Sequence, residues 1–238
     1  MAPADLFFDL DRTLWDFDRN SREALQEIFE ELAQSHLPEH RTTADFIAVY
    51  EVENEKCWAA YRAGELTQQE LRPLRFQRAM EGLGVDSFEG MGRIAEEMGE
   101  AYVRRAPYRT ALIDGALNVC NELKSRGHRM YVLTNGFDEV QHIKMENSGL
   151  NPYFEAVFTS DALGYKKPRV EAFHRSLALA GSDVNRAIMI GDDLECDVHG
   201  ARLAGWRQVH YDPTDAPTED GVWNRIRDLQ ELLNLDLR

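Results

Sequence analysis

The sequence lacks paired cysteines and an excess of basic residues. Its three cysteines, Cys57, Cys120 and Cys196, are scattered and form no CxxC pair, so we expect reduced thiols rather than a disulfide framework. Lysine and arginine number 27 against 42 acidic residues, which gives a net charge of −15. A nucleic acid polymer or an anionic membrane requires a basic surface on its partner, and this composition disfavours both.

The sequence also has little that would direct or anchor it elsewhere. No apolar run approaches the ~18 residues of a membrane span. The first residues do not form the basic segment and apolar run of a signal peptide. Together with the reduced cysteines, these features predict a cytoplasmic protein. With 238 residues, 43% of them hydrophobic, the chain can form one large domain or a domain with an insertion.

Residues 18–105 carry only helical periodicity. Asn20 with Glu23 predicts a capping box at the start of the first helix, and Pro73 predicts a kink in the third. These patterns indicate an all-helical insertion. The expected helices run from about residue 20, from 43 to 62, from 67 with a capping box of Thr67 and Glu70, and from 88 to 104.

Strands alternate with helices in the rest of the chain, residues 1–17 and 106–238. Such alternation predicts parallel βαβ units, so we expect an α/β fold with a doubly wound parallel sheet, interrupted by the helical insertion. Ligands of these sheets bind beyond the carboxyl ends of the strands. The expected strands are residues 5–10 and the segments RMYVLT, EAVFT, AIMIG and RQVHY, the last of them.

Polar residues follow these strands, some directly and some in the loop beyond. Alternate residues of a strand share a face, so Asp9 and Asp11 would repel each other unless a cation or a shared proton offset their charges. Four groups of polar residues follow the strands, and each group alone is compatible with a turn, a solvated lysine pair or the start of a helix. Their occurrence together at one edge of the sheet favours a ligand-binding site. The groups are Asp9 and Asp11, then Thr134 and Asn135, then Lys166 and Lys167, and finally Asp192, Asp193 and Asp197.

A divalent cation and a phosphoryl group suit this set of side chains. Mg²⁺ prefers carboxylate and carbonyl oxygens, which Asp9, Asp11 and Asp192 can supply. The oxygens of a phosphoryl group need cations and hydrogen-bond donors. The groups available for that are the metal, Lys167, Thr134 and Asn135.

Four segments in this order, DLDRT, LTNG, KKP and IGDDLECD, resemble the motifs of the haloacid dehalogenase-like hydrolase superfamily. The resemblance extends over the whole chain, because that family also inserts a helical cap after the first motif. It implies a Rossmann-like core made of residues 1–17 and 106–238, and a cap made of residues 18–105.

The resemblance also implies a phosphoric monoester hydrolase, with roles for single residues. Asp9 would be the nucleophile that becomes an aspartyl-phosphate. Asp11 would protonate the leaving group and then deprotonate water. Lys167 would stabilise charge on the nucleophile and the phosphate, while Thr134 and Asn135 would bind the phosphoryl oxygens of a small-molecule substrate.

For the metal, the resemblance implies Mg²⁺ held by the carboxylate of Asp9, the carbonyl of Asp11 and the carboxylate of Asp192. Asp197 matches a later acidic position of the family and would support the metal site from outside the ligands. The neighbours of matched positions that could share this work are Lys166 and Asp193.

Other activities remain compatible with these motifs. A 2-haloacid dehalogenase of the same fold needs neither the second aspartate nor a metal, so Asp11 and Asp192 favour phosphate. A transphosphorylating mutase shares the motifs, whereas a phospho-accepting signalling module fits poorly with the long helical insertion. The segment CWAAYRAGELTQQELRPLRF is similar to the family's bacterial pyrimidine 5′-nucleotidases. We therefore expect a pyrimidine nucleoside 5′-monophosphate as substrate, with a sugar phosphate as the alternative.

Overall fold

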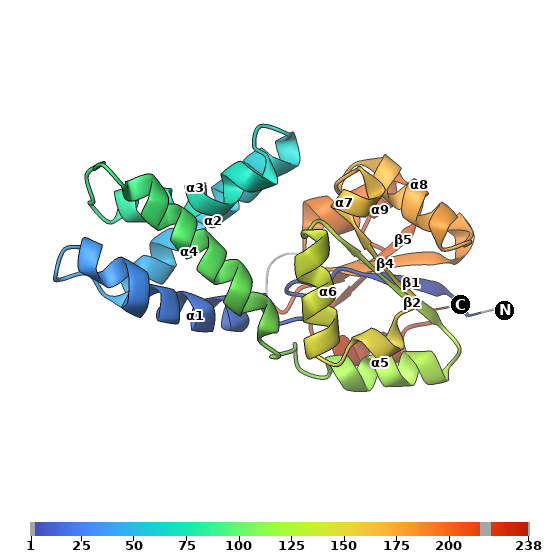
Figure 1. Ribbon diagram of the computed structural model, residues 1–238. Coiled ribbons are helices and arrows are strands. Elements are labelled where there is room, and N and C mark those ends of the chain that lie inside the picture. Colours follow the sequence, from blue (N-terminus) through green and yellow to red (C-terminus); the bar gives the residue numbers. More distant parts are fainter. Residues whose placement is uncertain (1–2, 215–219, 238) are drawn as a thin grey trace. The chain divides into compact units, whose positions relative to one another are not determined.

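A computed structural model of the protein describes residues 3–214 and 220–237. The chain divides into two compact units (Figure 1). The α/β unit comprises Met1–Phe17 and Arg109–Arg238, and the helical unit comprises Asp18–Tyr108. The return to the α/β unit, expected at residue 106, therefore comes at residue 109.

A parallel sheet of six strands forms the centre of the α/β unit (Figure 1). The strand order is β3-β2-β1-β4-β5-β6, and every pair of neighbours is parallel. The expected fold class, a doubly wound parallel sheet, is confirmed. The strands are β1 (Asp5–Phe8), β2 (Arg129–Thr134), β3 (Ala156–Thr159), β4 (Ala187–Gly191), β5 (Arg207–Tyr211) and β6 (Asn224–Ile226).

The sheet has one strand more than the sequence predicts. RQVHY forms β5, but β6 follows it and pairs with it in parallel, so the expectation that β5 is the last strand is wrong. β6 has three residues, of which Asn224 and Arg225 are polar. Such a segment carries no run of β-branched or aromatic residues, and the strand forms because β5 offers it a hydrogen-bonding edge.

Helices cover both faces of the sheet because alternate residues of β1 face opposite ways. Leu6 and Phe8 belong to one apolar cluster, with residues of α5 and α6, whereas Phe7 belongs to another, with residues of α7, α8 and α9. All four residues of β1 are buried. These helices are α5 (Ala116–Ser125), α6 (Asp138–Asn147), α7 (Ser160–Leu163), α8 (Val170–Leu179) and α9 (Gly200–Leu203).

One helix of this unit is less regular than expected. The segment ECDVHGARLAG predicts a single helix, but a π-helical stretch, Leu194–His199, precedes α9. The wider π-helical turn follows directly after β4, at the carboxyl edge of the sheet. Such turns are frequent at functional sites.

The helical unit contains α-helices only, apart from short π and 3₁₀ turns at Phe29–Ala33, Gln34–His36 and Ala106–Tyr108. Within the residues that the structure describes, no helix is both long and apolar enough to cross a membrane. The helices are α1 (Phe17–Ile28), α2 (Thr43–Ala63), α3 (Gln68–Gly82) and α4 (Met91–Arg105).

The helix starts follow the capping signals only in part. Thr67 and Glu70 form the predicted capping box of α3. The box predicted for Asn20 and Glu23 is wrong, because α1 already begins at Phe17 and Asn20 lies inside the helix. An N-cap residue must lie outside the helix for its side chain to reach the first free N–H groups.

Aromatic residues of the helical unit mostly pack its own core. Tyr50 and Phe76 are 1% and 0% exposed. The guanidinium of Arg75, on α3, lies 4.6 Å from the ring centroid of Tyr102 and donates a hydrogen bond to Asn54 Oδ1 at 3.0 Å. α3 continues through Pro73 as far as Gly82, and the kink at Pro73 stays a prediction.

Candidate active site

The carboxyl ends of β1 and β4 bring three predicted acids together. The two strands are neighbours, and the N–H of Asp9 donates to the carbonyl of Ile190 at 2.8 Å, which extends their pairing by one residue. One carboxylate oxygen from each of Asp9, Asp192 and Asp197 lies within 4.8 Å of the others. Residues almost two hundred positions apart in the sequence thus share one site.

Lys167 lies among these acids. Its Nζ donates to Asp9 Oδ1 at 2.7 Å and to Asp197 Oδ1 at 2.5 Å, and its side chain is 3% exposed. Burial opposes the charge on Lys167, but the carboxylates of Asp197 and Asp9 outweigh burial and raise the pKa of the lysine. Of the two adjacent lysines, Lys167 is therefore the one that contacts the predicted nucleophile.

The acids carry more negative charge than Lys167 can balance. Burial raises the pKa of Asp9, Asp192 and Asp197 to about 7 each, and the repulsion among the carboxylates adds to this effect. When all are ionised, three carboxylates and one ammonium leave a charge of −2. A divalent cation would balance that charge, and a donor set made of carboxylate oxygens suits Mg²⁺. These residues therefore fit the predicted metal.

Asp11 directs its side chain to other partners. Lys144 Nζ donates to Asp11 Oδ1 at 2.6 Å, and Gln141 Nε2 donates to Asp11 Oδ2 at 3.0 Å. Neither Gln141 nor Lys144 was predicted from the sequence. A signal was present, because a glutamine and a lysine stand three positions apart in the helix after LTNG, so they share one face of that helix. The carbonyl of Asp11 as a metal ligand stays a prediction.

Thr134 ends β2 beside these groups. Its Oγ1 accepts hydrogen bonds from the N–H of Gly136 at 3.1 Å and from Gln141 Nε2 at 2.9 Å. A hydroxyl accepts two hydrogen bonds and donates one. Its two acceptor positions are occupied, so the proton of Thr134 is oriented away from them, as a donor to a phosphoryl oxygen requires.

Asn135 fixes the backbone that carries Lys167. Its Nδ2 donates to the carbonyl of Lys167 at 2.9 Å, and its Oδ1 accepts from the N–H of Lys167 at 2.8 Å. The two bonds close a ring between the loops after β2 and β3. The amide of Asn135 therefore positions the lysine, and its contact with the substrate stays a prediction.

The carboxylates of Asp192 and Asp193 have different hydrogen-bond partners. Asp192 Oδ1 accepts from Thr13 Oγ1 at 3.2 Å, while the N–H of Asp192 donates to the same hydroxyl at 3.1 Å. The carboxylate of Asp193 accepts from the N–H groups of Glu195 and Cys196 and so caps the π-helical stretch. Asp192 is therefore the member of the pair that joins the acid cluster.

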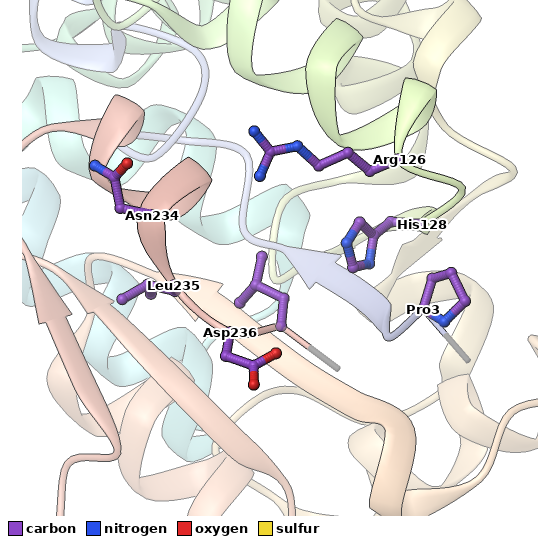
Figure 2. A pocket seen from close by; sticks show the side chains of 7 residues that line it. Pro3, Arg126, His128, Asn234, Leu235 and Asp236 are labelled. Atoms are coloured by element: carbon purple, nitrogen blue, oxygen red, sulfur yellow. The ribbon is translucent and has the colours of Figure 1, made fainter. Parts of the chain in front are cut away.

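A cavity of about 510 Å³ lies at the other edge of the sheet, by the amino ends of the strands (Figure 2). His128, before β2, donates from Nδ1 to the carbonyl of Ala4 at 3.0 Å, and burial lowers the pKa of this histidine. None of the predicted site residues lines this cavity. The residues that do so are Pro3, Arg126, His128, Asn234, Leu235, Asp236 and Leu237.

Comparison with known proteins agrees with this geometry. The family model of the haloacid dehalogenase-like hydrolases matches residues 6–205, most of the sequence. The chain belongs to the haloacid dehalogenase-like hydrolase family and is thus an enzyme of the hydrolase class. The resemblance of its four motifs to this family is confirmed.

Individual members of the family resemble the chain over most of its length. It is 29% identical to HAD-hydrolase YfnB of Bacillus subtilis, over 97% of this chain and 94% of the relative. It is 29% identical to the pyrimidine 5′-nucleotidase YjjG of Escherichia coli, over 87% of this chain and 86% of the relative. It is also 31% identical to the ribulose-1,5-bisphosphate 5-phosphatase of Halopiger xanaduensis, over 99% of both chains. A magnesium-bound crystal structure of YfnB matches with a TM-score of 0.83, 28% identity and 98% coverage of each chain.

Proposed function

We propose that this protein is a Mg²⁺-dependent phosphomonoesterase that acts through an aspartyl-phosphate on Asp9. The observation that carries the proposal is the buried cluster in which Lys167 contacts Asp9 while Asp192 and Asp197 lie beside them. The cluster offers a fixed nucleophile, a local cation and an acid set for a metal. Asp11 follows two residues later on the same loop.

In the first step, a carboxylate oxygen of Asp9 attacks phosphorus. The bond from phosphorus to the leaving oxygen breaks, and that oxygen takes the electron pair and a proton from Asp11. Lys167 balances charge on Asp9, and Thr134 donates its hydroxyl proton to a phosphoryl oxygen. These groups act where charge changes during the transfer.

In the second step, Asp11 takes a proton from water. The water oxygen attacks phosphorus, the bond to Asp9 breaks, and its electron pair returns to the carboxylate while inorganic phosphate leaves. Asp11 thus serves as acid and then as base.

The metal would be held by the carboxylates of Asp9 and Asp192 with the carbonyl of Asp11. Bound Mg²⁺ supplies positive charge to the phosphoryl oxygens. Asp197 accepts from Lys167 Nζ and, through Oδ2, from the N–H of Asp193 at 3.1 Å. It thereby orients both the lysine and the loop that carries Asp192.

A pyrimidine nucleoside 5′-monophosphate is the substrate class that we propose. The similarity to YjjG, a pyrimidine 5′-nucleotidase, over 87% of the chain supports it. A sugar phosphate is the second candidate, since the chain is also similar along its full length to a ribulose-1,5-bisphosphate 5-phosphatase. A haloacid substrate is disfavoured because dehalogenation needs neither a second aspartate such as Asp11 nor a metal ligand such as Asp192.

The test is a comparison of kcat/KM for UMP, dUMP and dTMP against sugar phosphates and 2-chloropropionate, with Mg²⁺ and with EDTA. We expect Mg²⁺-dependent phosphate release, fastest with the nucleotides. A sugar phosphate that is faster by tenfold, about 1.4 kcal/mol of transition-state preference, would reject the nucleotide but keep the phosphatase. Dehalogenation in EDTA would reject both.

A further inference from the structure

Two side chains of α6 hold the carboxylate of Asp11, and the chemical steps above use neither of them as acid, base or nucleophile. Lys144 donates to Oδ1 at 2.6 Å and Gln141 donates to Oδ2 at 3.0 Å, so both carboxylate oxygens are fixed. Lys144 is 5% exposed and Gln141 is fully buried. Contacts from two buried donors on one helix leave the carboxylate little freedom to rotate.

Lys144 also touches the far end of the loop that carries Asp11. Its Nζ lies 4.3 Å from the ring centroid of Trp15. The loop turns back on itself, because the N–H of Arg12 donates to the carbonyl of Trp15 at 2.9 Å. Trp15 is fully buried, and its Nε1 donates to the carbonyl of Arg109 at 3.0 Å. The ammonium therefore links Asp11 to a ring that is itself fixed.

Gln141 connects Asp11 to the predicted phosphoryl-binding residue. Its Nε2 donates both to Asp11 Oδ2 and to Thr134 Oγ1. No group in the described part of the chain donates to the buried Oε1 of Gln141, so the orientation of the amide serves its two acceptors. A Cβ at Gly136 would lie 1.8 Å from Nε2, so the glycine leaves the space that the amide occupies.

Stability alone does not account for a buried lysine at this place. Replacing both partners of a buried ion pair by apolar side chains of similar volume is often neutral or stabilising, because burial removes both charges from water. Asp11 is the one carboxylate within ion-pairing distance of Lys144 among the described residues. The charge is thus placed against the group that the proposed mechanism uses for proton transfer.

We propose that Lys144 and Gln141 are positioning residues that hold Asp11 in the orientation needed to protonate the leaving group. This inference rests on the proposed phosphatase function. A general acid acts only within hydrogen-bond reach of the oxygen that it protonates, and a misplacement of about 1 Å can cost about 10²-fold in rate. Lys144 and Gln141 act through Asp11 and touch no reacting atom.

The leaving group provides the test. A nucleoside alcohol is a poor leaving group that needs a proton, whereas p-nitrophenolate leaves with little help. We expect Lys144→Met to lower kcat/KM, which reports the steps up to departure of the leaving group, by about 10²-fold for UMP and by less than about threefold for p-nitrophenyl phosphate. Hydrolysis of the intermediate, in which Asp11 is the base for either ester, does not enter kcat/KM. Methionine fills a similar volume but leaves the part-buried Asp11 without its cation, so we expect a lower melting temperature, and both rates are measured at a temperature where the variant is folded.

Three further variants make the result specific. Lys144→Arg keeps the cation and should recover part of the activity on UMP. Lys124→Met removes an exposed lysine that donates to the carbonyl of Pro152 on the same unit, and it should leave both activities intact. Lys144→Met combined with Asp11→Asn should be no slower on UMP than Asp11→Asn alone. Asp11→Asn already lacks the acid that Lys144 orients, so the second substitution has nothing further to remove.

Equal losses of kcat/KM on the two esters, or a double variant whose kcat/KM falls by the product of the single losses, would overturn the positioning role. If Lys144→Met does not fold, Lys144→Gln takes its place under the same criteria. A wild-type protein that hydrolyses neither ester would instead reject the proposed function, and the positioning role with it.

Discussion

At the scale of single residues, the account depends on Asp9 as the nucleophile. Asp9→Asn should keep the fold and lose measurable phosphate release, because an amide cannot form the acyl phosphate. The matched control is Asp193→Asn, since asparagine caps a helix about as well as aspartate. The measurement is kcat on UMP with saturating Mg²⁺. Substantial turnover by Asp9→Asn would contradict the assignment.

The two adjacent lysines give a second test at this scale. Lys167→Ala should lower kcat/KM by about 10²–10³-fold, the usual loss when a group that stabilises developing charge is removed. Lys166→Ala should change kcat/KM by less than about threefold, because Lys167, and not Lys166, contacts Asp9 and Asp197. The reverse ranking would show that the KKP loop works in another register.

At the scale of secondary structure, β1 begins with a buried ion-pair network. Asp5 is fully buried and contacts Arg129 at 2.6 Å and Arg186 at 3.2 Å. Burial alone would raise the pKa of Asp5, but hydrogen bonds from Arg129 and Ser182 and the charges of both arginines outweigh burial and lower the pKa. The network joins β1 to β2 and to the turn before β4.

This network predicts how stability depends on pH. A lowered pKa in the folded state contributes stability above the unfolded pKa of about 4, and that contribution is lost as the pH falls through the folded pKa. Asp5→Asn should therefore lower the free energy of unfolding by about 1–3 kcal/mol at pH 7, with a smaller difference at pH 2.5. Urea unfolding at the two pH values measures it. A loss in the free energy of unfolding that is the same at pH 7 and at pH 2.5 would contradict the charge network assigned to Asp5.

The strands and the strand ends were largely predictable from the sequence, whereas β6 and the partners of Asp11 were not. The alternation of apolar segments predicts the sheet, and residues 9, 11, 134 and 192 lie at or just beyond the ends of β1, β2 and β4, whereas Lys167 follows α7 in the connection after β3. β6 could not be predicted, because its three residues are ordered by the edge of β5 rather than by their own preference. The contact of Lys144 with Asp11 joins residues 133 positions apart. It depends on where α6 packs, and no local pattern contains that information.

At the scale of the whole molecule, we expect metal binding and folding to be coupled. The raised pKa values of Asp9, Asp192 and Asp197, about 7 each, mean that the folded protein without metal binds protons there that the unfolded chain has released. That contribution to stability is present in full below about pH 4 and is lost as the pH rises through about 7. Mg²⁺ requires the ionised carboxylates, so its affinity should rise over the same range.

The rise in melting temperature caused by Mg²⁺ should therefore be larger at pH 8 than at pH 5.5, because a tighter ligand of the folded state stabilises it more. Asp192→Asn should reduce the rise at pH 8. Thermal unfolding with 5 mM EDTA or about 5 mM Mg²⁺, which exceeds the Kd of ordinary Mg²⁺ enzymes, measures both. An equal rise at the two pH values would contradict the acid cluster as the metal site.

Trapping the covalent intermediate tests phosphoryl transfer through Asp9 without relying on the identity of the natural substrate. Asp11→Asn should hydrolyse the intermediate slowly, because it lacks the base for water, while p-nitrophenyl phosphate still phosphorylates it without an acid. After an acid quench, borohydride reduction of the acyl phosphate and peptide mass spectrometry should find homoserine at position 9 and at no other aspartate. Homoserine at another position, or an unmodified protein directly after release of one equivalent of p-nitrophenol, would contradict phosphoryl transfer through Asp9.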